Sequence, residues 1–209
     1  MLQEANLILF LTASLVVIVA PGPDNILVLT RGVTLGRKAA LVSATGASVG
    51  LVTHSLFAAA GLSALLAQSV LAFSLVKYAG AAYLIFLGVR ALLDRNSFVL
   101  AQGTPPVGLR SVFAQAVASN VLNPKIAVFF LAYLPQFADP AAGGVAPQLL
   151  ALGPTFALLT WAIFGVIARF SGTLGGWLRS RPRFASGLGR LTGGVLIGLG
   201  LRLALPGRR

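Results

Sequence analysis

A proline-interrupted apolar run near the N-terminus constrains this chain more than any other stretch. The run begins near Leu7 and resumes at Ile26, and between them lies Ala20-Pro21-Gly22-Pro23-Asp24-Asn25. Two prolines remove two backbone donors and the glycine loosens the chain between them, so a continuous helix should break here. The run from Leu7 to Ala20 has 14 residues. A helix of that length covers about 21 Å, which is short of a hydrocarbon core of about 30 Å.

This first segment spans a membrane only if it continues through the prolines to about Thr30. Such a path puts a broken helix, freed backbone groups and the Asp24 carboxylate at membrane depth. Lipid does not tolerate unpaired backbone groups unless protein or a water-filled cavity surrounds them. We therefore expect this stretch to form one wall of a transport site.

The composition is typical of a polytopic membrane protein. Of 209 residues, 57% are hydrophobic and 10% are charged, and the mean hydropathy is +0.91, which leaves too little polar surface for a soluble domain. The net charge of +12 does not indicate nucleic acid, because the basic residues lie between apolar runs without interleaved aromatics. The chain has no cysteine, which excludes disulfides and thiolate metal sites. We expect no cofactor and no metal.

Six apolar segments follow one another, separated by short linkers, and each approaches the roughly 20 residues that a spanning helix needs. We expect helices over about 5–30 (broken), 39–62, 71–93, 111–135, 148–170 and 187–205. No segment is left over for a soluble domain. Residues 1–209 should therefore form a single all-α transmembrane transporter domain in contact with the lipid bilayer.

The basic residues predict an orientation in the membrane. Eleven of the sixteen lie at the first, third and fifth linkers: Arg31, Arg37, Lys38, Arg90, Arg95, Arg110, Arg169, Arg179, Arg181, Arg183 and Arg190. The linkers near 62–71 and 136–148 carry none. Because basic loops stay on the cytoplasmic side, we expect the odd linkers inside and both termini external. Arg202, Arg208 and Arg209 oppose this orientation, but they are fewer.

A second proline break lies in the fourth segment, at Gln115, Ser119, Asn120, Asn123, Pro124 and Lys125. Gln115, Ser119 and Asn123 recur every four residues and make a polar stripe on one helical face. Pro124 frees the carbonyl of Asn120, and neighbouring amides can satisfy it again. The lysine follows near the bilayer centre, where ionisable groups mark functional pathways by default. This combination favours a pathway role over packing alone.

Two further ionisable residues lie inside apolar segments. His54 has two interpretations, a proton relay or a packed histidine hydrogen-bonded to a neighbour. Lys77, beside Tyr78, must pair, face water or extend back to the interface. Near His54, Gly46 and Gly50 form a small-xxx-small face that favours close helix packing.

The two proline-broken segments are the first and the fourth, three helices apart. Three helices per half is an odd number, so the halves would run in opposite senses through the membrane. This is the 3+3 inverted repeat of secondary transporters, whose site lies where broken helices meet. A restarting helix offers N–H groups to an anion, and freed carbonyls suit an ammonium. A zwitterion such as an amino acid fits that pair.

The chain also resembles a known family in five blocks that run in the family's order. They are Ala20-Pro21-Gly22-Pro23-Asp24, Arg31-Gly32-Val33-Thr34-Leu35-Gly36-Arg37, Lys77-Tyr78-Ala79-Gly80-Ala81-Ala82-Tyr83-Leu84, Asn123-Pro124-Lys125 and Phe129-Phe130-Leu131-Ala132-Tyr133-Leu134-Pro135-Gln136-Phe137. These blocks are similar to the lysine exporter / homoserine–threonine resistance (LysE/RhtB) family. The resemblance implies a six-helix exporter of amino acids or related molecules in the bacterial inner membrane. It also implies proton antiport, with a homodimer among the assemblies to consider.

The predicted substrate and proton pathway combines the resemblance with the polar residues at the two breaks. The resemblance carries over Pro21, Gly22, Pro23, Asp24, Lys77, Asn123, Pro124 and Lys125, and our interpretation adds Asn25, Tyr78, Gln115, Ser119 and Asn120. The family has either Asp or Asn at the position of Asp24, so a titrating carboxylate there is not a universal coupling group. No residue is assigned a catalytic role.

We therefore expect export of a small amino acid or derivative by proton antiport and alternating access. Asp24 would bind the substrate ammonium or a proton, and Lys77 and Lys125, or the amides at the broken helix ends, would meet the carboxylate. A passive channel and, less favoured, an intramembrane enzyme or an assembly subunit are the alternatives. The intramembrane enzyme is less favoured because the four acidic residues and one His of the chain form neither a paired-carboxylate motif nor a metal-binding cluster. With one deep carboxylate, a neutral substrate such as threonine, homoserine or leucine is weakly favoured.

Overall fold

The computed structural model describes residues 4–62, 70–93, 107–139 and 144–205. These ranges are almost entirely helical and contain no strand. The all-α class expected from the sequence is therefore confirmed. Apolar helices dominate, as expected for a protein that crosses a membrane several times.

The first proline break bends the chain between α1 (Glu4–Val19) and α2 (Pro23–Leu35) by 53°. Pro23 occupies the first turn of α2, where its missing N–H costs nothing. Helix α2 continues to Leu35, beyond the expected end near residue 30. It ends because Gly36 adopts a positive φ of 88°, a conformation that favours glycine.

Helix α3 (Arg37–Phe57) follows at once and ends in a π-helical turn, η1 (Ala58–Leu62). Its glycine face packs closely on α6 (Leu109–Val121). A Cβ added at Gly46 would lie 2.7 Å from the Phe113 carbonyl, and one at Gly50 would lie 2.7 Å from Asn120 Oδ1. These glycines therefore serve close helix packing, as the small-xxx-small spacing indicates.

The second proline break bends α6 by 48° from a run of short helices: α7 (Pro124–Val128), the π-helical η2 (Phe129–Tyr133) and the 3₁₀ turn η3 (Leu134–Phe137). Asn123 caps α7, because its Oδ1 accepts a hydrogen bond from the Lys125 N–H at 3.1 Å. Both expected breaks thus occur at the expected prolines.

The C-terminal part of the chain is more helical than expected. Helix α8 (Val145–Ser180) runs ten residues past the expected 148–170 segment, and α9 (Pro182–Ala204) begins two residues later. The extension persists because apolar residues such as Trp177 and Leu178 pack against Leu29 of α2. Arg181 makes the turn, and Pro182 starts α9 at a position that suits proline.

Among the described residues, three helices are long and apolar enough to cross a membrane, and up to five if each bent pair is one span. The expected sixth span, 187–205, lies within α9 except for its last residue, but α9 does not belong to this set. Helix α9 is rich in glycine and carries Arg190 and Arg202, which lowers its hydropathy. The exact six-span 3+3 repeat therefore stays a prediction.

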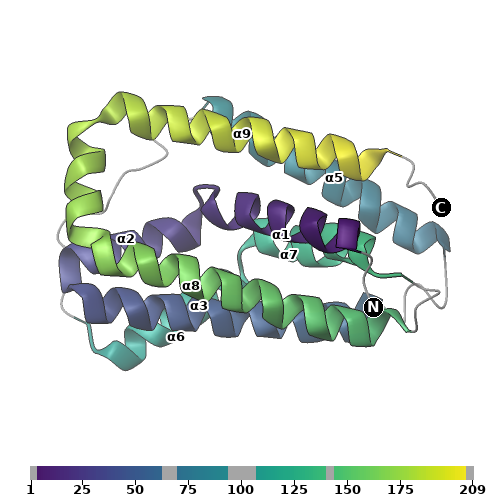
Figure 1. Ribbon diagram of the computed structural model, residues 1–209, viewed down its shortest axis with the longest axis horizontal. Helices are drawn as coiled ribbons and strands as arrows, with labels where there is room; N and C mark the ends of the chain where they lie inside the picture. Colours follow the sequence, from purple (N-terminus) through teal and green to yellow (C-terminus); the bar gives the residue numbers. More distant parts are fainter. Residues whose placement is uncertain (1–3, 63–69, 94–106, 140–143, 206–209) are drawn as a thin grey trace.

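The helices form two groups with part of each bent segment between them (Figure 1). On one side α5 (Val70–Leu93) packs along α9, and on the other α3 packs against α6 and α8. Helices α1 and α7 lie between these groups. Aromatic rings fill the core around them, with the Phe129 and Phe156 centroids 4.8 Å apart. The packing brings the two proline breaks together.

Candidate functional site

The Asp24 carboxylate joins the first proline break to the second. Its Oδ2 accepts hydrogen bonds from Asn120 Nδ2 at 2.8 Å and Asn123 Nδ2 at 2.9 Å, and its Oδ1 accepts from Ser119 Oγ at 3.4 Å. The side chain is 5% exposed and lies in the first turn of α2, where the helix dipole favours a negative charge. Three donors from one break thus converge on a carboxylate from the other.

Lys125 makes the reciprocal connection. Its Nζ donates to the carbonyl oxygens of Ala20 at 3.0 Å and Val17 at 3.2 Å, and the side chain is 6% exposed. In a continuous helix the Val17 carbonyl would accept from residue 21, but Pro21 has no N–H. The ammonium of the second break therefore replaces a donor that the first break lost.

Side-chain amides and a histidine satisfy the remaining freed carbonyls. Asn25 Nδ2 donates to the Ile18 carbonyl at 2.7 Å. The Asn120 carbonyl, freed by Pro124, accepts from the Asn123 N–H at 2.9 Å and from His54 Nε2 at 3.1 Å. His54 thus bonds to a backbone carbonyl inside the core, which is the packed arrangement of the two considered for it.

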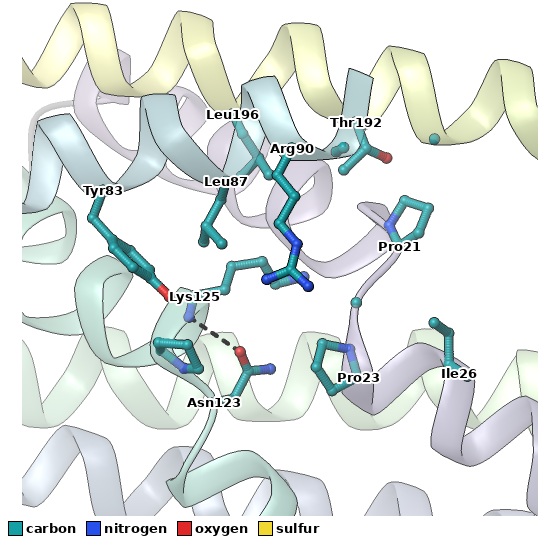
Figure 2. A pocket seen from close by; sticks show the side chains of 14 residues that line it. Pro21, Pro23, Ile26, Tyr83, Leu87, Arg90, Asn123, Lys125, Thr192 and Leu196 are labelled. Atoms are coloured by element: carbon teal, nitrogen blue, oxygen red, sulfur yellow. Dashed lines mark hydrogen bonds between the residues drawn. The ribbon is translucent and has the colours of Figure 1, made fainter. Parts of the chain in front are cut away.

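A cavity of about 380 Å³ lies between the breaks and the α5–α9 pair. It is lined by Pro21, Gly22, Pro23, Ile26, Tyr83, Leu87, Arg90, Ala91, Asn123, Pro124, Lys125, Gly189, Thr192 and Leu196. Figure 2 shows Arg90 reaching from α5 toward Lys125 and Pro23. The volume falls at the lower end of the range typical of small-molecule sites.

Lys125 stands between this cavity and a much smaller one around Asp24. The smaller space, about 10 Å³, is lined by residues that include Asp24, Asn25, Asn120 and Lys125. Asp24 therefore lies one layer behind the large cavity, and Lys125 lines both spaces.

The polar stripe on α6 and at the cap of α7 contacts α2 at Asp24 and Arg31. Ser119 and Asn123 reach Asp24, while Gln115 Oε1 accepts a hydrogen bond from Arg31, seven residues after Asp24 on α2. Arg31 is 7% exposed, and its Nη1 has no hydrogen-bond partner within the described chain. The sequence placed Arg31 in a linker, whereas the structure buries it inside α2.

Two of the predicted pathway residues lie away from the breaks. Lys77 Nζ donates to the Leu205 carbonyl at 3.0 Å, and Tyr78 is 52% exposed. Neither lines the cavity. Tyr83 and Arg90, seven residues apart on the same helix, line it instead. The other eleven predicted residues are at or around the junction of the breaks, with Gln115 at its periphery on Arg31.

Sequence reasoning missed Tyr83, Arg90 and Thr192 as cavity residues. In the sequence analysis, Arg90 served only as one of the basic residues that predict the orientation of the chain in the membrane. The signal that could have found it is the spacing of Tyr83, Leu87 and Arg90, at positions i, i+4 and i+7, which puts the three on one helical face.

Comparison with known proteins adds independent information. The family described as "LysE type translocator" matches residues 15–207. A homoserine/homoserine lactone efflux protein of Salmonella typhimurium is 30% identical over 195 residues, covering 93% of this chain and 94% of that protein. A leucine efflux protein of an Enterobacter species is 26% identical over 198 residues, 93% of each chain. An "uncharacterized membrane protein" of Vibrio cholerae is 32% identical over 195 residues, 93% of this chain and 94% of that one. No solved structure gives a significant match.

Proposed function

The chain belongs to the LysE type translocator family, and on this premise we propose that it exports a small amino acid or derivative by alternating access. The membership confirms the resemblance seen in the sequence. It also places the chain among multi-pass membrane transporters rather than enzymes. The proposal extends this to a single domain of six spans in the bacterial inner membrane, with both termini external.

The observation that carries the proposal is the reciprocal connection between the two breaks. Asp24 of the first break accepts from Asn120 and Asn123 of the second, and Lys125 of the second donates to carbonyls of the first. Charged groups at membrane depth that face a cavity mark substrate and ion pathways. The broken helix ends also offer both N–H and carbonyl groups, which suits a solute carrying both charges.

In the proposed mechanism the solute enters the cavity with its carboxylate toward Lys125. Two hydrogen bonds to carbonyls occupy this ammonium, and its third N–H can meet the carboxylate. The solute ammonium, or a proton, competes with Asn120 and Asn123 for Asp24. Protonation removes acceptor capacity from Asp24 and weakens the contact of α2 with α6 and α7.

Proton antiport follows if solute and proton occupy Asp24 in turn. Binding of either the solute or the proton to Asp24 breaks hydrogen bonds that hold α2 against the second break. Occupancy of Asp24 would therefore be linked to the relative position of the broken helices. A ligand can shift such an equilibrium only through a difference in affinity between the two states. The Asp24 cluster offers that difference, because its donors are in place in one state and released in the other.

The test is counterflow of labelled amino acids in proteoliposomes that contain the purified protein. A carrier gives saturable exchange, with transient accumulation of label against an excess of unlabelled solute inside. An outward-directed transport step coupled to protons is stimulated by an imposed pH gradient. A passive channel gives neither saturation nor accumulation. No exchange by folded protein across neutral, cationic and acidic amino acids would contradict the proposal.

A further inference from the structure

Two cationic side chains face the large cavity, and none of its described lining residues is acidic. Arg90 enters from α5 and Lys125 from α7 (Figure 2). Asp24 lines only the small space behind Lys125, where three side-chain donors already hold its oxygens. The cavity therefore stabilises a negative charge, and a free ammonium inside it meets two like charges.

The two cations are not equivalent. Lys125 already donates hydrogen bonds to the Val17 and Ala20 carbonyls. Arg90 has no hydrogen-bond or ion-pair partner in the described part of the chain, and its side chain is exposed. Its planar guanidinium presents a fork of N–H donors that matches a carboxylate in bidentate geometry.

The other described residues that line the cavity are uncharged. Ile26, Leu87 and Leu196 supply apolar surface, together with the three prolines of the breaks. Tyr83 and Thr192 bring neutral hydroxyl groups. A solute that fits this wall has a small uncharged body with an apolar side chain.

We propose that Arg90 is the carboxylate anchor and specificity residue of this cavity, and that the site selects small monocarboxylates with an apolar body whether or not they carry an amine. The inference deepens the proposed function, since it rests on the cavity receiving the exported solute. It gives the solute carboxylate a second cation beside Lys125, on α5 and outside the two proline breaks.

The test measures binding to purified protein in detergent, by thermal stabilisation titrated with three related probes. Leucine carries both charges, 4-methylpentanoate lacks only its amine, and leucinamide has a neutral amide in place of its carboxylate. We expect 4-methylpentanoate to bind within about threefold of leucine, and leucinamide to bind at least about tenfold more weakly, as expected for the loss of a hydrogen-bonded charge.

The variants Arg90→Gln and Arg90→Lys test the residue itself. Arg90→Gln should weaken leucine and 4-methylpentanoate alike, by about 10- to 100-fold. Arg90→Lys should recover part of that loss, because it keeps the charge but not the fork. Arg110→Gln, which removes an exposed charge from the first turn of α6 outside the cavity, should bind as the wild type does.

Three results overturn the inference. They are leucinamide binding as tightly as leucine while 4-methylpentanoate binds weakly, unchanged binding by Arg90→Gln, and no saturable binding of either carboxylate to folded wild type. Because binding in detergent needs no transport, the two proposals fail separately. If binding depends on Arg90 but no counterflow is seen, only the proposed export is contradicted. If counterflow is seen but binding does not depend on Arg90, only the role of Arg90 as the carboxylate anchor is contradicted.

Discussion

Gly22→Ala is a direct steric probe of the Lys125 contact between the two breaks. Gly22 has extended backbone angles, φ −165° and ψ 179°, which alanine adopts without strain. A Cβ at this position would lie 2.9 Å from Lys125 Nζ and 3.4 Å from its Cε. The substitution therefore leaves the local backbone allowed and acts on the ammonium group.

The geometry sets the size of the effect. Ordinary contact with a Cβ begins near 3.4 Å, so Nζ must retreat by about 0.5 Å along that direction, as close-packed atoms require. Its hydrogen bonds of 3.0 Å to Ala20 and 3.2 Å to Val17 are already at ordinary length, and the longer one is lost first. A hydrogen bond to a charged group contributes about 1.5–3 kcal/mol. We expect Gly22→Ala to lower the free energy of unfolding by about that amount.

A double-mutant cycle measured by unfolding in detergent isolates the contact. The Lys125→Ala background removes the two atoms nearest to the new Cβ at Gly22, and the next one, the Ala20 carbonyl oxygen, lies at an ordinary 3.9 Å, so the same substitution should cost less than about 0.5 kcal/mol. Gly165→Ala, at a helical glycine with open space around it, should be neutral or stabilising by up to about 1 kcal/mol. An equal loss with and without Lys125, or no loss in either background, would refute the reasoning.

Three further substitutions test the surroundings of Asp24. Gly50→Ala puts a Cβ 2.7 Å from Asn120 Oδ1 and 2.8 Å from its Cβ, so we expect a loss of about 1–3 kcal/mol in stability from overpacking and slower exchange in proteoliposomes. His54→Gln can keep an N–H near the Asn120 carbonyl, so exchange should keep the wild-type pH profile, whereas a proton relay would change it. Gln115→Leu removes the hydrogen-bond partner of buried Arg31, and unfolding in detergent should show a loss of about 3 kcal/mol.

Each of these substitutions has a matched control in the chain. Gly165→Ala controls for the helix propensity gained by Gly50→Ala. His54→Phe keeps an aromatic ring beside Phe130 but removes the N–H, so it should cost about 1–3 kcal/mol where His54→Gln costs less. Gln115→Glu keeps an acceptor for Arg31 and should retain more stability than Gln115→Leu. Equal losses of stability for His54→Gln and His54→Phe, or for Gln115→Leu and Gln115→Glu, would contradict the hydrogen bond assigned to that residue.

The features that depend on local backbone chemistry were predictable from the sequence. Proline removes a donor wherever it stands, so the breaks at Pro21 and Pro124 and the freed Asn120 carbonyl follow without tertiary information. The four-residue spacing of Ser119 and Asn123 likewise put both on one face, and both reach Asp24 in the structure. Which partner each freed group finds was only partly predictable, since His54 approaches from another helix.

The features that depend on helix rotation were not predictable in the same way. Lys77 and Arg90 lie on the same helix, and the family resemblance assigned Lys77, which is deeper in the apolar run, to the site. Packing of α5 on α9 turns Lys77 to the Leu205 carbonyl and leaves Arg90 facing the cavity. Arg31 shows the same limit, because a charge near a helix end looks like a linker residue until its partner Gln115 is known.

The length of α8 has a related cause. Ser171 to Ser186 contains glycine and arginine and was expected to be a linker, yet the helix persists to Ser180. Its stability comes from packing of Leu178 against Leu29 on a distant helix, and most helical stability in proteins has that tertiary origin.

The most direct test of the account is counterflow by Asp24→Asn and Lys125→Ala beside wild type and Arg110→Gln. All four proteins are reconstituted at equal density after their folding has been checked by size exclusion in detergent. The account predicts saturable exchange of a small amino acid by wild type and Arg110→Gln, with at least about a tenfold loss in both junction variants, the size expected when a charged hydrogen bond is removed. Wild-type exchange that neither junction variant changes would contradict a transport site at the two proline breaks.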